Sequence, residues 1–230
     1  MPDITVAGRD GNFSAYLALP KKTPAPGVLV AQEIFGVNAV MRGVCNWLAG
    51  EGFVALCPDL FWRIEPGIQI TDKTQAEWKR AFELFGLFDV DRGIDDMMSA
   101  LQALRGHEAC TGKAGTIGYC LGGKLAYLMA TRSSTDCAVG YYGVGLQELL
   151  EEAENIKKPL MLHIAEEDQF VPKAAQKEIK AGLRGHPEVT IHSYPGRDHA
   201  FARKGGEHYH PADTKTANQR TIAFLKEHLA

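Results

Sequence analysis

Cys120 lies between two glycines, Gly118 and Gly122, in the pattern Gly-x-Cys-x-Gly. The same spacing around a serine is typical of hydrolases whose nucleophile lies on a sharp turn between a strand and a helix. An apolar run ends at Tyr119 and a helical pattern begins at Leu121, so the sequence predicts such a turn here. The glycines would allow strand and helix to approach closely. A thiolate at Cys120 would be a nucleophile, and the N–H of Leu121 at the helix start could stabilise an oxyanion.

Cys120 could instead be a structural cysteine, because free cysteine is among the most buried residue types. Its position between a strand and a helix favours the catalytic interpretation. The other four cysteines lack this setting and form no Cys-x-x-Cys pair, so we expect neither a disulfide framework nor a zinc site. These four are Cys45, Cys57, Cys110 and Cys137. His208 and His210 lack a third ligand at a metal-like spacing, and we expect no metal.

A cysteine nucleophile benefits from a histidine base and from a third group that orients the imidazole. In α/β-hydrolases the chain order is nucleophile, acid, histidine. Asp168 and His199 each follow a strand-like run, in that order after Cys120. Taken alone, the aspartate would be interpreted as a helix cap and the histidine as a surface residue. Their order and their positions favour a triad, in which Glu166 and Glu167 are alternatives for the acid.

Strand-like runs alternate with helical patterns along the chain. The predicted strands are residues 13–19, 28–32, 53–57, 114–119, 138–142, 160–165 and 189–194. The predicted helices are residues 40–49, 72–85, 91–105, 121–131, 146–153, 173–184 and 213–229. This alternation predicts a mostly parallel sheet flanked by helices on both faces, in a single α/β domain over residues 1–230. In such sheets, sites lie beyond the carboxyl ends of the strands, where the three candidate residues fall.

The composition is that of an ordinary globular protein, with 45% hydrophobic and 23% charged residues and a formal net charge of −3. No block of lysine and arginine stands out, so neither nucleic acid nor a membrane surface is expected as a partner. No apolar stretch approaches the length of a membrane span, and the N-terminus lacks the pattern of a signal peptide. We therefore expect a cytoplasmic monomer.

Six motifs along the chain are similar to those of one known family: AQEIFGVN, CPDL, GYCLGG, AVGYYGVG, DQFVP and DHAFAR. From about residue 10 to the C-terminus the chain resembles dienelactone hydrolase, also called carboxymethylenebutenolidase. The resemblance implies an α/β-hydrolase fold, a triad of Cys120, Asp168 and His199, and no cofactor. It also implies that Glu33 takes part in activating the thiol and that the N–H of Ile34 joins that of Leu121 in an oxyanion hole. Arg203 matches an arginine that binds the substrate carboxylate.

The residues themselves are compatible with these roles but do not require them. Glu33 ends a buried strand pattern, where an unpaired carboxylate is costly, and Arg42 or a backbone amide could be its partner instead. Arg203 is four residues beyond His199, and a planar guanidinium suits bidentate recognition of a carboxylate. A surface salt bridge is the alternative for this arginine.

One position departs from the family pattern. Trp78 stands where better-studied members have a second substrate-binding arginine, and Arg80 is two residues away, on a different helical face. Trp78 is therefore predicted to contact the substrate, and the identity of that substrate is left open. Tyr141 and Tyr142, at the end of a predicted strand, are expected to line the pocket, with core packing as the alternative.

These observations predict a hydrolase of lactones or esters of small carboxylated substrates that works through an acyl-enzyme intermediate. Trp78 favours one alternative, a general cysteine esterase or thioesterase. A second alternative is a non-catalytic ligand-binding α/β protein, although a binding module has no use for the complete set of candidate catalytic residues.

Overall fold

The structure is a computed structural model that describes residues 3–230. Backbone contacts divide the chain into two compact units, one ending at Gly115 and the other beginning at Thr116. A single domain over residues 1–230 stays a prediction. Within residues 3–230, every helix is too short or too polar to cross a membrane.

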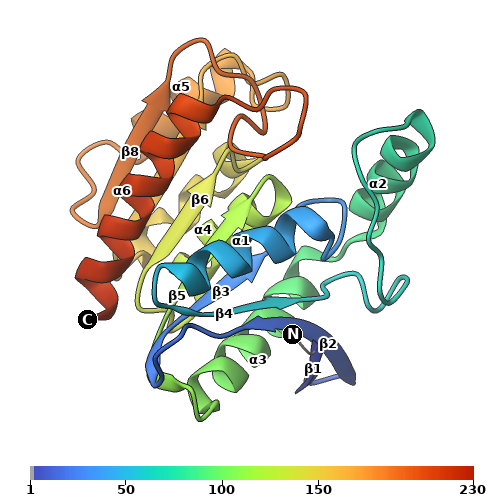
Figure 1. Cartoon of the computed structure of the whole chain (residues 1–230). Helices are drawn as coiled ribbons and strands as arrows, with labels where there is room; N and C mark the ends of the chain where they lie inside the picture. Colours follow the sequence, from blue (N-terminus) through green and yellow to red (C-terminus); the bar gives the residue numbers. More distant parts are fainter. Residues whose placement is uncertain (1–2) are drawn as a thin grey trace. The chain divides into compact units, whose positions relative to one another are not determined.

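The first unit contains four neighbouring strands in the order β1, β2, β4, β3. Their bounds are Asp3–Ala7 for β1, Asn12–Ala18 for β2, Ala25–Ala31 for β3 and Val54–Pro58 for β4. Strand β2 pairs antiparallel with β1 and β4, whereas β3 and β4 are parallel. The helices are α1 (Ala39–Gly50), α2 (Gln75–Leu87) and α3 (Val90–Gly106). Helices α1 and α3 pack on these strands, while α2 extends away from them (Figure 1).

The second unit contains the end of β5 (Cys110–Tyr119) and three further strands, in the order β5, β6, β7, β8, all parallel. The bounds of these three are Ala138–Tyr141, Leu160–Ala165 and Val189–Tyr194. The helices are α4 (Leu121–Arg132), the 3-10 helix η1 (Leu146–Asn155), α5 (Lys173–Gly182) and α6 (Pro211–Leu229). Helix α4 packs on β6 and α6 on β7 (Figure 1).

Helix starts follow the capping residues. The Asn38 side chain accepts hydrogen bonds from the N–H groups of Val40 and Met41, which begins α1. The Thr74 hydroxyl accepts from the N–H of Glu77, so α2 begins at residue 75 and not at the predicted 72. Strand β1 was not predicted, because only one of its five residues, Val6, is buried and its hydrophobic pattern is weak.

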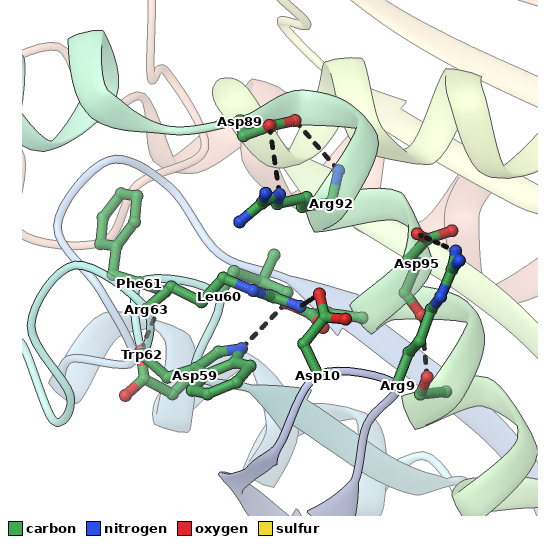
Figure 2. Close-up of polar contacts among 12 residues, drawn as sticks. Arg9, Asp10, Asp59, Leu60, Phe61, Trp62, Arg63, Asp89, Arg92 and Asp95 are labelled. Atoms are coloured by element: carbon green, nitrogen blue, oxygen red, sulfur yellow. Dashed lines mark hydrogen bonds and ion pairs between the residues drawn. The ribbon is translucent and has the colours of Figure 1, made fainter.

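The Pro- and Gly-containing segment after β4 is fixed by buried polar groups. Asp59 accepts hydrogen bonds from the N–H groups of Phe61 and Gly67, at 3.1 and 2.7 Å. Arg63 forms an ion pair with Asp10 at 2.8 Å, which links this segment to the turn between β1 and β2 (Figure 2). These contacts of Asp59 and Arg63 make the segment an ordered part of the first unit.

The same segment is also attached to α3. Asp96, only 1% exposed, accepts a hydrogen bond from the indole N–H of Trp62 at 2.9 Å and pairs with Arg63. The guanidinium of Arg63 also lies over the Trp62 ring, 4.4 Å from its centroid. A buried carboxylate with two donors satisfies the requirement that buried charge be paired.

Candidate active site

Cys120 lies on the predicted turn between β5 and α4, with a backbone φ of 57°. Among residues 3–230, the only other non-glycine residues with positive φ are Tyr142 and Ala200. Such conformations are strained for residues with a β-carbon, and they persist where the surrounding structure holds them. In the second unit, Tyr142 directly follows β6 and Ala200 directly follows His199. The strain is therefore concentrated around the candidate catalytic groups.

The glycines beside Cys120 allow this turn to form. A β-carbon on Gly118 would lie 1.8 Å from the carbonyl oxygen of Gly122. One on Gly123 would lie 2.6 Å from the carbonyl oxygen of Tyr141. Both distances are well below van der Waals contact, so strand β5, helix α4 and strand β6 can meet here only because these side chains are absent.

The backbone around Cys120 leaves one donor available. The Cys120 N–H donates to the carbonyl of Tyr141 at 3.1 Å, and the Cys120 carbonyl accepts from the N–H groups of Gly123 and Lys124. Leu121 is the first residue of α4, so its N–H has no acceptor within the helix. A donor at a helix start beside the thiol is suited to stabilising negative charge on a substrate oxygen.

Asp168 and His199 are directly hydrogen-bonded, with the carboxylate 2.8 Å from Nδ1 of the imidazole. Both are buried, with side chains 1% and 7% exposed respectively. The other carboxylate oxygen of Asp168 accepts from the N–H groups of Phe170 and Val171. The acid is therefore held in place by its own loop, and it fixes the orientation of the imidazole.

The other ring nitrogen of His199 is not used by Asp168. This Nε2 atom is buried and has no hydrogen-bond partner of good geometry. Burial alone would lower the pKa of His199, but the charge of Cys120 and the hydrogen bond with Asp168 raise it to about 10. A thiolate beside an imidazolium is a strong nucleophile.

Two aromatic rings pack on the imidazole edge-to-face. The Tyr142 ring centroid is 5.0 Å from that of His199, and the Phe170 centroid is 4.8 Å from it. Tyr142 is buried, whereas Phe170 is 38% exposed. Tyr142, predicted to line the pocket, therefore contacts the histidine, and its role toward substrate stays a prediction. Phe170 was not singled out, because a phenylalanine in a loop carries no distinctive sequence signal.

The alternatives for the acid have other partners. Glu167 pairs with Lys173 at 2.8 Å and Glu166 lies 3.5 Å from Lys180. Arg203, predicted to bind the substrate carboxylate, is 4% exposed and lies in the same loop as the histidine, four residues after it. It is therefore buried, unlike the arginine of a surface salt bridge.

The remaining candidates belong to the first unit. Glu33 and Ile34 come one residue after the end of β3 and are buried, at 2% and 5% exposure. Arg42, the alternative partner for Glu33, instead contacts the carbonyl of Val37, the carboxylate of Asp3 and the ring of Tyr16.

The structure gives partners to Trp78, which departs from the family pattern, and to Arg80, two residues later on α2. The indole N–H of Trp78 donates to the carbonyl of Asp72 at 3.1 Å, and the ring packs edge-on against Phe35. Arg80 forms ion pairs with Glu65 at 2.6 Å and with Glu83 at 3.1 Å. Its charge is therefore already matched by two carboxylates.

Comparison with known proteins identifies the family. The model of the dienelactone hydrolase family matches residues 13–229. The chain belongs to the dienelactone hydrolase family. A relative from Azospirillum brasilense is 53% identical over 232 residues, covering the whole of both chains. A carboxymethylenebutenolidase of Pseudomonas sp. (strain P51) is 42% identical over 94% of this chain and 90% of its own. One from Pseudomonas putida is 39% identical over 96% and 94%.

Solved structures agree with this membership of the dienelactone hydrolase family. A structure from Klebsiella pneumoniae subsp. pneumoniae has a TM-score of 0.87 at 26% identity and covers 98% of this chain and 97% of its own. An esterase of Pyrococcus furiosus, at 17% identity and a TM-score of 0.75, shares the fold alone. The predicted α/β-hydrolase fold, with mostly parallel strands and helices, is confirmed. The chain is a hydrolase of carboxylic esters or lactones, and the non-catalytic alternative is not supported.

Proposed function

We propose that this hydrolase opens lactones or esters of small carboxylated substrates with Cys120 as nucleophile, His199 as base and Asp168 as orienting acid. The observation that carries the proposal is the buried hydrogen bond of 2.8 Å between the acid and Nδ1, with Nε2 of the same ring buried and without a good partner. Relatives named carboxymethylenebutenolidase support a lactone as the substrate. Arg203 is the proposed partner of the substrate carboxylate.

In the proposed reaction, the thiolate of Cys120 attacks the carbonyl carbon and a carbon–sulfur bond forms. The N–H of Leu121 stabilises the resulting oxyanion, and loss of such a donor typically lowers the rate about 100- to 1000-fold. The carbon–oxygen bond to the leaving group then breaks, giving an acyl-enzyme and an enolate, which takes the proton held by the imidazolium of His199 and leaves the ring neutral. His199 next removes a proton from water, which attacks the thioester and releases the acid and the thiol.

Three further roles remain predictions from the family resemblance: Glu33 in activating the thiol, Ile34 as a second oxyanion donor, and Trp78 as a substrate contact. The proposed reaction uses neither a metal nor an organic cofactor. An enol ester has a good leaving group, so a thiolate nucleophile is sufficient, whereas a peptide amine would leave poorly.

The test compares Cys120→Ala with Cys110→Ala on a dienelactone and on p-nitrophenyl acetate. Cys110 is the matched control, because it is the other cysteine that is not fully buried. We expect the first variant to lose at least about 1000-fold in kcat/KM and the second to retain activity. His199→Ala should accumulate an acyl adduct on Cys120, detectable by mass spectrometry. Undiminished turnover by Cys120→Ala would rule out the proposed nucleophile.

A general cysteine esterase or thioesterase is the second candidate, favoured by the environment of Trp78. Its indole N–H is already bonded, and the charge of Arg80 is matched by Glu65 and Glu83. Neither side chain is thus suited to a second substrate carboxylate. The ratio of kcat/KM for dienelactone to that for p-nitrophenyl acetate and acyl thioesters separates the two functions. Trp78→Arg should raise this ratio if the residue contacts substrate, and Phe85→Arg, an exposed position on the same helix, should not.

A further inference from the structure

The acid and the base lie on two neighbouring loops of the second unit. The acid loop, residues 166–172, follows β7, and the base loop, residues 195–203, follows β8. Their backbones are joined near the strand ends, where the N–H of Glu166 donates to the carbonyl of Tyr194 at 3.1 Å. The N–H of Glu167 donates to the carbonyl of Arg197 at 2.7 Å. Both bonds involve acid-loop residues that come before Asp168 in the sequence, and neither involves the residues that follow it.

Asp198 links the two loops beyond that point. One oxygen of its carboxylate accepts from the N–H of Gln169 at 3.1 Å and from the N–H of His199 at 2.6 Å. Gln169 directly follows the acid, and His199 is the base itself. A single oxygen therefore binds the backbone next to Asp168 and the backbone of the histidine. Hydrogen bonds from backbone N–H groups to a carboxylate are among the stronger ones in proteins.

The surroundings of Asp198 are compatible with a fixed carboxylate. Its side chain is 29% exposed, and its second oxygen lies 3.8 Å from Nε2 of His208. The adjacent Arg197 is paired with Asp213 at 3.0 Å, so it does not compete for this carboxylate. The loops are also linked by the Asp168–His199 hydrogen bond and by the packing of the Phe170 ring on His199.

We infer that Asp198 is a positioning residue, whose carboxylate fixes the acid loop against the base loop and so keeps Asp168 aligned with His199. The inference rests on the proposed function. Without this carboxylate, the N–H groups of Gln169 and His199 lose their acceptor. The contacts between the loops beyond the strand side are then those of the His199 ring with Asp168 and Phe170. A displacement of about 1 Å in a catalytic group can cost about 100-fold in rate, although Asp198 itself touches neither substrate nor thiol.

The test is a set of variants at this position. Asp198→Ala should lower kcat about 10- to 100-fold with little change in KM, because alignment and not substrate binding is lost. Asp198→Asn keeps an oxygen acceptor of the same length and should restore kcat to within about threefold of the parent. Glu178→Ala, an exposed carboxylate on α5, should behave as the parent. If the alanine variant does not fold, Asp198→Ser, whose hydroxyl can accept one of the two bonds, should give an intermediate kcat.

A second readout separates positioning from general stability. The proton on Nδ1 of His199 should give a downfield resonance in the parent and in Asp198→Asn, and this signal should weaken or shift in Asp198→Ala. A parent-like kcat and an unchanged resonance in the alanine variant would overturn the inference. Failure of the proposed function would differ, because the parent itself would then hydrolyse no ester or Cys120→Ala would stay active.

Discussion

A β-carbon on Gly118 would lie 1.8 Å from the carbonyl oxygen of Gly122, four residues further along the chain. Strand β5 and helix α4 therefore meet with no space between their backbones, and Cys120 lies at the point of the turn they form. The position of Cys120, the proposed nucleophile, depends on this close contact, which is possible because Gly118 has no side chain.

Gly118→Ala should disrupt the turn. The clash is with backbone, which cannot rotate away, so we expect the free energy of unfolding to fall by at least ~3 kcal/mol together with esterase activity. Gly43→Ala is the control, because Gly43 is exposed within α1 and an added β-carbon meets nothing within 4 Å. That change should be neutral or stabilise by up to ~1 kcal/mol. Urea unfolding measures both, and equal stabilities would contradict this account of the turn.

Asp168→Asn should lower the pKa of His199 and reduce kcat by about 100- to 10,000-fold. In the parent, the charge of Cys120 and the hydrogen bond with Asp168 outweigh burial and raise that pKa to about 10. A raised histidine pKa stabilises the folded protein below the unfolded pKa of about 6.5, and this contribution is lost as pH rises toward 10. The parent should therefore lose more stability than the variant between these pH values.

Titration of the His199 ring by NMR in the parent and in Asp168→Asn measures the change directly, and thermal unfolding across the same pH range measures its effect on stability. Glu167→Gln, at an exposed residue of the same loop, serves as the control for loss of a carboxylate. An unchanged imidazole titration in Asp168→Asn would show that the carboxylate has no influence on the base.

Asp96→Ala should destabilise the first unit strongly. Asp96 is buried and paired with Arg63 and with the indole N–H of Trp62. Its loss leaves the indole without its acceptor and removes one of the two carboxylates paired with Arg63. We expect a loss of about 2–4 kcal/mol in the free energy of unfolding. Asp95→Ala, one residue away, removes a pair with Arg9 in which the side chains are 39% and 78% exposed (Figure 2), and it should change stability by less than ~0.5 kcal/mol. Chemical denaturation measures the free energy of unfolding of both variants. Similar losses would contradict the stabilising role given to the buried Asp96.

His163→Gln should make the protein less sensitive to acid. Burial, and then the nearby charges of His192 and Arg220, hold the pKa of His163 well below its ordinary value. The unfolded chain therefore binds a proton below about pH 6.5 that the folded chain does not, which costs up to about 1.4 kcal/mol of stability per pH unit. The variant lacks this contribution, so its free energy of unfolding should fall less steeply from pH 6.5 to 5.

The slope, and not the absolute stability, is the quantity to compare, because His163 also bonds Tyr194 and Thr221 at 2.8 and 3.0 Å, and these bonds are altered in the variant. A parent-like slope in His163→Gln would mean that this histidine is protonated in the folded state.

The fold was largely predictable because strands and helices alternate with clear periodicity and because glycines mark the turn at Cys120. The hydrogen-bonded pair of Asp168 and His199 was expected from their order and from their positions after strands, and their roles as acid and base stay predictions. Phe170 and Asp198 were not, because their importance comes from contacts between segments about 30 residues apart. The state of Arg80 depends on Glu65, 15 residues earlier, and no local pattern encodes such a pairing.

Among the non-glycine residues of the described range 3–230, positive φ angles occur at Cys120, Tyr142 and Ala200. Ala200→Gly would relieve the strain at that position, but it would also make the backbone next to His199 more flexible. Substitutions that raise heat tolerance by relieving backbone strain should therefore avoid these three positions, because the strained backbone is part of the proposed active site.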